Sequence, residues 1–352
     1  MRTMLVLCGA LVVTCSASAV GPVRVSLAGS RPAPTVRQPW SAELAIRPRS
    51  FRGAVRVTAA GPGRVVARAS RTSGSYRVRL VFPRVGRWKL TARAGGSTSQ
   101  LGSVTVRRPP PLRFVFPTSV DVQPDGSLLV VENGRGRVLV VQPATGRTRV
   151  LASGLPKPFA AVRAPSGSIF ISDGHSLRRL EGSGAPETLA TADEDIGPIE
   201  IASNGVAFYA TGTRLFRLPA AGGTPQSVAT GLSNPHGVAV AADGAVLVTD
   251  TAADRVLRID SDGTGSTLIR TAQPRGIDVA ADGTIYVVEA GTRRVGHFSA
   301  AGARLGVVGP VFGDPYDVVA GPGGVIFVVD TSAAGVIRRV ASNGTTVTLP
   351  TG

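Results

Sequence analysis

The sequence predicts an all-β protein in two parts, a small β-sandwich followed by a larger set of repeated short strands. Two observations lead to this prediction. Segments in which apolar and polar residues alternate dominate residues 20–106, and one pattern of about forty residues recurs through residues 114–352. The 352 residues include 44 Gly and 26 Pro, which imply many turns, and the 43% of hydrophobic residues suffice for sizeable cores.

The first 19 residues have the features of a secretory signal peptide. Arg2 precedes an apolar run over residues 4–13, and the small residues that end at Ala19 are typical of a cleavage site. We therefore expect a secreted, extracellular protein that begins at residue 20. The alternative is a lipoprotein attached through Cys15. Both cysteines precede the cleavage site, so no disulfide is expected, and no later segment is long and apolar enough to predict a transmembrane helix.

Residues 20–106 form the first predicted domain. Apolar and mainly basic side chains alternate over residues 75–82 and again over residues 87–93, which predicts half-buried antiparallel strands. The pattern QPW…GSYRVRLVFPRVGRW resembles the Ig-like domains of secreted bacterial proteins, and the resemblance implies a sandwich of two sheets. Three successive prolines in RRPPPLR, residues 107–113, favour a stiff linker to the second domain.

Charge separates the two domains. Residues 20–111 carry 18 basic residues and a single acid, Glu43, whereas residues 112–352 carry 20 basic and 21 acidic residues. This excess predicts that the first domain attaches to an anionic surface, either lipid or a cell-wall polymer. The candidate contacts are Arg77, Arg79, Lys89 and Arg93. No nucleic-acid partner is expected for a secreted protein, and the simpler alternative is that the basic side chains only solvate a small domain.

A repeat fills residues 114–352. Six copies align on a turn glycine with spacings of 41, 38, 39, 39 and 41 residues: Gly126, Gly167, Gly205, Gly244, Gly283 and Gly324. Five copies have a leading proline before the first strand, and the glycine turn leads into a second strand. Two further strands follow. A period near forty with four short strands per copy predicts a six-bladed β-propeller, because single sheets cannot bury both faces alone.

The copies share a motif that resembles the NHL repeat. Its consensus is P-x-G-[IV]-x-V-x-x-D-G-x-[IL]-x-V-x-[DE]…R-V, and residues 235–256 and 274–295 match it best. This resemblance implies a six-bladed propeller of the NHL type. For a secreted protein of this fold we expect a role in extracellular recognition of a protein or a small-molecule ligand, and we expect a monomer. Related six-bladed propellers include streptogramin lyases and lactonases of the SMP-30 type, which use a divalent metal in the central channel. The alternative function is therefore a divalent-metal-dependent lyase or lactonase at the channel mouth.

The position after the leading proline varies from copy to copy. Its occupants are Thr118, Phe159, His236, Arg275 and Tyr316. The second strand returns to the end where the first began, so these residues are expected at one face together with the end of each second strand. Variation at a repeated position predicts a binding face, and His236 is the candidate general acid or base there.

Five of the six copies end the second strand with a carboxylate. These residues are Glu132, Asp173, Asp250, Glu289 and Asp330, and the third copy has Thr211 instead. Such oxygens could hold Ca²⁺ or Mg²⁺, the cofactor that the enzymatic alternative would need. Repetition favours a structural role instead, because a catalytic residue is needed only once. Spacings of five residues between an acid and an arginine predict the pairs Glu132–Arg137, Asp250–Arg255 and Glu289–Arg294.

Overall fold

The computed structural model describes residues 22–29, 32–72, 75–108, 111–332 and 335–350. It divides the chain into two compact units, Met1–Pro109 and Pro110–Gly352. The predicted signal peptide, Cys15 and the prolines at positions 109 and 110 lie outside the described residues. Within the part of the chain that is described, no helix is long and apolar enough to cross a membrane.

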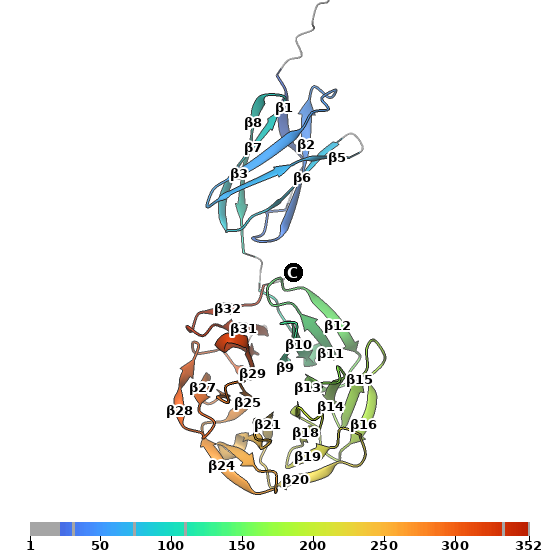
Figure 1. The fold of residues 1–352 in the computed structure, drawn as a ribbon, viewed down its shortest axis with the longest axis vertical. Helices are drawn as coiled ribbons and strands as arrows, with labels where there is room; N and C mark the ends of the chain where they lie inside the picture. Colours follow the sequence, from blue (N-terminus) through green and yellow to red (C-terminus); the bar gives the residue numbers. More distant parts are fainter. Residues whose placement is uncertain (1–21, 30–31, 73–74, 109–110, 333–334, 351–352) are drawn as a thin grey trace, which may run out of the picture. The chain divides into compact units, whose positions relative to one another are not determined.

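The first unit consists of two four-stranded antiparallel sheets (Figure 1). One sheet has the order β1-β2-β6-β5, with β1 (Arg24–Ala28), β2 (Pro39–Arg47), β6 (Ser75–Val81) and β5 (Ser70–Thr72). The other has the order β4-β3-β7-β8, with β4 (Arg64–Arg68), β3 (Val55–Ala60), β7 (Gly86–Ala94) and β8 (Ser97–Val106).

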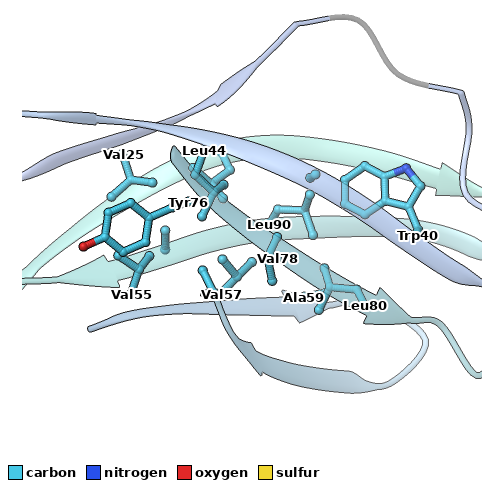
Figure 2. Packing of buried hydrophobic residues seen from close by; sticks show 14 of the residues in the cluster. Val25, Trp40, Leu44, Val55, Val57, Ala59, Tyr76, Val78, Leu80 and Leu90 are labelled. Carbon is cyan, nitrogen blue, oxygen red and sulfur yellow. The ribbon is translucent and has the colours of Figure 1, made fainter. Parts of the chain in front are cut away.

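The two sheets bury one face each. Buried and exposed residues alternate along β6 and β7, as the sequence predicts. Figure 2 shows the resulting core, in which Leu44 and Val78 of one sheet meet Val57 and Leu90 of the other. Both tryptophans of the chain lie in this core: Trp40 is 6% exposed and Trp88 is 0% exposed.

The second unit contains six four-stranded sheets, each formed by four consecutive strands. The first three sheets comprise β9 (Pro117–Val122), β10 (Leu128–Glu132), β11 (Arg137–Val141) and β12 (Thr148–Ser153); β13 (Pro158–Arg163), β14 (Ile169–Asp173), β15 (Ser176–Leu180) and β16 (Glu187–Thr191); and β17 (Ile199–Ile201), β18 (Ala207–Ala210), β19 (Arg214–Leu218) and β20 (Gln226–Thr230).

The other three sheets comprise β21 (Pro235–Val240), β22 (Val246–Asp250), β23 (Arg255–Ile259) and β24 (Gly265–Arg270); β25 (Pro274–Val279), β26 (Ile285–Glu289), β27 (Arg294–Phe298) and β28 (Arg304–Val308); and β29 (Pro315–Gly321), β30 (Val325–Asp330), β31 (Val336–Val340) and β32 (Thr346–Thr348). Among the described residues, three short 3-10 turns occur in connections: η1 (Asn133–Arg135), η2 (Thr251–Ala253) and η3 (Pro322–Gly324).

The sheets surround a common axis, so the second unit is a β-propeller (Figure 1). The first strand of each sheet contacts the first strand of the next, and β29 contacts β9, which completes the ring. All five leading prolines begin a first strand. The third copy, which lacks this proline, has a first strand of only 3 residues. The turn glycines used to align the repeat all have positive φ, from 71° to 93°.

A segment before β9 holds the ring closed. The N–H of Leu112 donates to the carbonyl of Leu349 (2.7 Å), and the N–H of Phe114 donates to the carbonyl of Gly335 (2.7 Å). Phe114 is 4% exposed and packs in a core shared by the first and last sheets. The last sheet has four strands of its own, and residues 111–114 therefore run beside it as an additional clamp.

Candidate functional site

A β-bulge near the start of the first strand sets the direction of each of the five predicted face residues. Each leading proline pairs with the carboxylate that ends the second strand, as Pro235 does with Asp250. The register then shifts, so that His236 is left without a partner in the ladder and Gly237 pairs with Thr249. The same irregularity occurs at Thr118, Phe159, Arg275 and Tyr316. A bulged residue is turned away from the regular alternation, and this turn lets side chains from different sheets meet.

Three of the face residues form an aromatic cluster. The ring centroids of His236 and Tyr316 are 5.1 Å apart, those of Phe159 and His236 are 5.5 Å apart, and those of Phe159 and Tyr316 are 6.0 Å apart. Phe116 extends the cluster with a centroid 5.7 Å from that of Tyr316. The guanidinium carbon of Arg275 lies 5.3 Å from the Tyr316 ring centroid. The rings meet edge to face or tilted, which is the favourable arrangement.

The cluster contains an uncharged imidazole. Burial and the nearby Arg275 charge lower the pKa of His236 to about 4, so its ring is neutral at pH 7. Its Nδ1 has no hydrogen-bond partner among the described residues. Burial also raises the pKa of Tyr316 to about 12, so this phenol keeps its proton. Arg275 itself is held by Asp314, with an Nη1–Oδ1 distance of 2.8 Å.

A pocket of about 570 Å³ opens above this cluster. We call it the face pocket. The cluster provides its floor. The loops that precede β13, β17 and β21 contribute the polar groups of Lys157, Glu194 and Asn234, and the β10–β11 and β18–β19 connections contribute those of Asn133 and Thr213. Its volume lies within the range of small-molecule sites, which combine an apolar floor with a few polar groups.

Two residues that line the face pocket have a backbone in the left-handed region. Phe116 has φ 48° and is 48% exposed, and Asn234 has φ 57°. Phenylalanine in this conformation is unusual, because its Cβ crowds the backbone. Two hydrogen bonds hold the segment that contains Phe116. The N–H of Val115 donates to Glu132 Oε1 (2.7 Å), and the N–H of Asn133 donates to the carbonyl of Phe116 (3.1 Å).

The face pocket lies where the repeat is broken. Thr211 occupies the strand-end position that is a carboxylate in the other copies, and it lines the pocket. The acid comes from the preceding loop instead: Glu194 accepts hydrogen bonds from the N–H (3.2 Å) and the Oγ1 (3.0 Å) of Thr213. Its neighbour Asp195 pairs with Lys157. A smaller side chain at the strand end leaves room at this part of the face.

The five strand-end carboxylates are buried in ion pairs. Their side chains are at most 2% exposed, and each has an arginine partner: Glu132 with Arg135 and Arg137, Asp173 with Arg178, Asp250 with Arg255, Glu289 with Arg304, and Asp330 with Arg338. Four of them also accept backbone N–H groups from the segment before the leading proline, such as that of Lys157 for Asp173 (2.7 Å). These interactions are those of structural caps.

One predicted pair is wrong. Glu289 stands opposite Arg294 in the ladder, but its carboxylate binds Arg304 of β28 at 2.6 and 2.9 Å. Gly296 explains the difference, because a Cβ there would lie 2.9 Å from Glu289 Oε1. The absence of a side chain lets the glutamate reach across β27 to the outer strand.

These carboxylates do not fit a metal site. No group of three or more His, Cys, Asp or Glu in the described residues is arranged to hold a metal ion. The structure brings His236 together with Thr118, Phe159 and Tyr316, but it leaves the five acids in separate caps. A cation at any one of them would have to displace an arginine.

Four other carboxylates, which sequence reasoning missed, line the channel below the aromatic cluster. Asp121, Glu200, Asp278 and Asp317 come from the first strands of four sheets and surround a cavity of about 190 Å³. Their signal is an acid in the middle of an apolar first strand, as in GIDVA at residues 276–280. Phe159, His236 and Tyr316 line both this cavity and the face pocket, so the cluster separates the two.

Three of the channel acids each accept a hydrogen bond from a backbone N–H of a neighbouring sheet, and we call each of these contacts a clasp. Asp278 Oδ2 accepts the N–H of Ala320 (2.7 Å), and Asp317 Oδ2 accepts the N–H of Val120 (2.9 Å), which joins the last sheet to the first. Asp121 Oδ2 accepts the N–H of Arg163 at 3.4 Å. Burial raises the pKa of Asp121 to about 6 and the pKa values of Asp278 and Asp317 to about 7, although hydrogen bonds oppose the shift. Burial and the other three acids raise the pKa of Glu200 as well.

The predicted anionic-surface residues do not share one face. Arg77 and Arg79 project from β6, and Arg77 pairs with Glu43 at 2.7 Å. Lys89 and Arg93 project from β7, which belongs to the other sheet. Alternation along a strand indicates that a side chain points outward, but it does not indicate to which sheet the strand belongs. The sequence therefore could not show that Arg77 and Arg79 lie on one sheet and that Lys89 and Arg93 lie on the other.

No protein-family model and no curated protein matches this chain. Solved structures do resemble it. Virginiamycin B lyase from Staphylococcus aureus has a TM-score of 0.54 and 17% identity, covering 68% of this chain and 87% of that one. A gluconolactonase from Xanthomonas campestris has a TM-score of 0.57 and 16% identity, covering 64% and 86%. The calcium-binding protein regucalcin from Agrobacterium tumefaciens has a TM-score of 0.54 and 14% identity, covering 62% and 83%. These identities show a shared propeller fold and nothing finer.

Proposed function

We propose that the second unit is a six-bladed NHL-type propeller that recognises a ligand at the face pocket. We propose further that the first unit, an Ig-like sandwich, attaches the secreted protein to an anionic surface. The observation that carries the first proposal is the position of the face pocket. It lies at the third copy, where Thr211 replaces the carboxylate cap, and over the bulged aromatic residues.

The lining indicates the class of ligand. An aromatic floor favours a ligand with a flat or apolar ring, because stacking and edge contacts add to burial. The polar rim offers both donors and acceptors, including Asn133, Asn234 and Thr213. We therefore propose a small ring-bearing compound with hydrogen-bonding substituents, such as a sugar or an aromatic metabolite.

Saturation-transfer NMR with pooled sugars and aromatic compounds tests this proposal. Binding is expected with the full-length chain and is expected to be lost in Phe159→Ala and Tyr316→Ala. Leu305→Ala is the matched control, because Leu305 is 55% exposed on β28 and does not line the face pocket. Equal signals from all variants would place binding elsewhere, and no signal from any compound would oppose a small-molecule site.

A divalent-metal-dependent lyase or lactonase is the second candidate. The fold shared with virginiamycin B lyase and a gluconolactonase supports it, as does the position of His236. The carboxylates present do not fit a metal, and an imidazole with a pKa of about 4 is a weak base at pH 7. We therefore rank binding above catalysis.

Thermal unfolding with EDTA or with Ca²⁺, Mg²⁺, Mn²⁺ or Zn²⁺ separates the candidates. A ligand at a hundred times its dissociation constant stabilises the folded state by about 2.7 kcal/mol. The recognition proposal predicts no such shift. A rise of several degrees with one metal, together with lactone hydrolysis that His236→Ala abolishes, would establish the enzyme instead.

A further inference from the structure

The outer face of the sheet β4-β3-β7-β8 carries six cations. They are Arg56, Arg64, Arg68, Arg87, Lys89 and Arg93, and all six side chains are exposed. They alternate with buried residues of the sandwich core such as Val57, Trp88 and Leu90. The alternation places the cations on the solvent side of the sheet. We call this surface the cationic face.

Cross-strand register gathers the charges into rows. Arg56 stands opposite Arg68 on one side and Arg93 on the other, so three arginines adjoin across three strands. A second row lies four residues further along β3, where Ala60 stands between Arg64 on one neighbouring strand and Lys89 on the other. Strands in a sheet lie about 4.8 Å apart, and like charges directly opposite each other destabilise the pairing.

No carboxylate relieves this repulsion within residues 20–111. Glu43 is the single acid there, and it lies on β2 of the opposite sheet, bound to Arg77. The opposite sheet therefore holds a neutralised pair, whereas the cationic face holds none. An external polyanion would supply the missing countercharge.

The row between the two cationic rows is uncharged. Thr58 stands opposite Val66 and Thr91, and this neutral row leaves a lane flanked by cations on both sides. Val66 is the one large apolar side chain among the rows, and no aromatic residue accompanies it. Proteins that bind a bilayer surface combine charge with inserted apolar or aromatic groups, so the cationic face fits a polymer better than a membrane.

We propose that the cationic face binds a linear phosphodiester polymer. Five of the six cations are arginines, whose paired N–H groups suit phosphate oxygens, and a chain in the neutral lane would present its phosphates to both cationic rows. This inference rests on the proposed attachment of the first unit to an anionic surface. To that proposal it adds which face of the first unit contacts the partner and which chemical groups the partner presents.

Binding of the full-length chain to immobilised poly(glycerol phosphate), measured from 50 to 400 mM NaCl, tests this inference. Arg56→Gln/Arg93→Gln and Arg64→Gln/Lys89→Gln are each expected to weaken binding at least tenfold. Each is also expected to reduce the slope of log affinity against log salt by about one to two, because fewer counterions are released. Arg24→Gln/Arg79→Gln removes the same charge from the opposite sheet and is expected to change affinity threefold or less.

The same variants are expected to fold, because each removes a repulsion, and an unchanged or raised thermal midpoint checks this. Equal losses in all three double variants would mean that net charge alone binds the polymer, which overturns the face assignment. Tight binding to polyglutamate overturns the phosphate assignment. Binding to anionic phosphatidylglycerol vesicles without binding to the polymer overturns this inference and leaves surface attachment standing, whereas binding to neither removes both.

Discussion

Asp330 illustrates how a buried carboxylate is stabilised in this protein. Burial opposes its ionisation, but Ser332, the N–H groups of Asp314 and Gly313, and Arg338 together hold its pKa at about 2. Its side chain is 0% exposed. The group is therefore charged and fully partnered at neutral pH, and four other sheets repeat the arrangement with their own arginine.

Asp330→Ala is expected to destabilise the second unit by about 3 kcal/mol, because it leaves Arg338 without its countercharge and two N–H groups without an acceptor. Urea unfolding followed by far-UV circular dichroism measures the loss. Asp262→Ala is the matched control: this exposed acid interacts with Thr264 of its own turn, whose N–H it accepts at 2.8 Å, and its loss is expected to cost less than about 1 kcal/mol. Equal losses would show that the ion pair contributes nothing.

Phe116, in contrast, has a conformation that reduces stability while its ring contributes to the face pocket. Its φ of 48° is unfavourable for any residue with a side chain. Phe116→Gly is expected to leave the thermal midpoint unchanged or higher, because relief of backbone strain offsets the lost contact with Tyr316. Ligand binding at the face pocket is expected to fall. Gln273→Gly is the matched control, because Gln273 has a φ of 47° and does not line the face pocket, and a matching fall in its binding would contradict this assignment.

The element that defines the face pocket is the first strand of each sheet. Its leading proline, its bulge and its midpoint acid each have a separate effect, as in β29, where Pro315 begins the strand, Tyr316 faces the pocket and Asp317 clasps β9. The approach of these strands is close: a Cβ on Gly276 would lie 2.5 Å from the Cα of Asp317. The close packing of β25 against β29 therefore requires glycine at this position.

Sequence periodicity predicted these strands but only part of the site. The leading prolines and varied following residues located the aromatic cluster, because both recur at a fixed distance from the turn glycine. Periodicity could not show that Asp278 and Asp317 share a cavity, because it contains no distance between strands of different sheets. The partner of Glu289 was likewise missed, since Gly296 opens a path that is visible only in three dimensions.

The clasps predict an unusual pH dependence. The pKa values of Asp278 and Asp317 rise from 3.8 to about 7 in the folded state, so the folded chain binds more protons between these values. The stability that this supplies is complete below about pH 4 and is lost as pH rises through about 7. His236 acts in the opposite sense, because its folded pKa is lowered from 6.5 to about 4.

The thermal midpoint of the second unit is therefore expected to fall between pH 5 and pH 7.5. Asp278→Asn/Asp317→Asn is expected to flatten this dependence, and the difference between variant and parent cancels the contribution of His236. Asp243→Asn is the control, since the pKa of Asp243 is lowered by Arg258 and this acid lies outside the channel. Identical profiles for the parent and the double variant would show that the clasps do not titrate in this range.

At the scale of the whole molecule, one chain joins a strongly basic unit to a unit whose charges are nearly balanced. Residues 20–111 carry 18 basic residues against one acid, whereas residues 112–352 are almost balanced. Self-repulsion destabilises a compact basic domain, and salt screens this repulsion over a Debye length of about 10 Å at 0.1 M. The stability of the two units should therefore respond differently to ionic strength.

Raising NaCl from 20 to 500 mM is expected to increase the unfolding temperature of the first unit by several degrees and to change that of the second by much less. The two can be followed separately, because Trp40 and Trp88 are the only tryptophans and both lie in the first core. Tryptophan fluorescence thus reports the sandwich, and calorimetry reports both units. Arg56→Gln/Arg93→Gln should raise the low-salt midpoint of the sandwich and reduce its response to salt, because the adjoining Arg68–Arg56–Arg93 row supplies part of the repulsion. A salt response equal in both units would mean that general effects of salt on apolar burial, rather than charge repulsion in the first unit, set its stability.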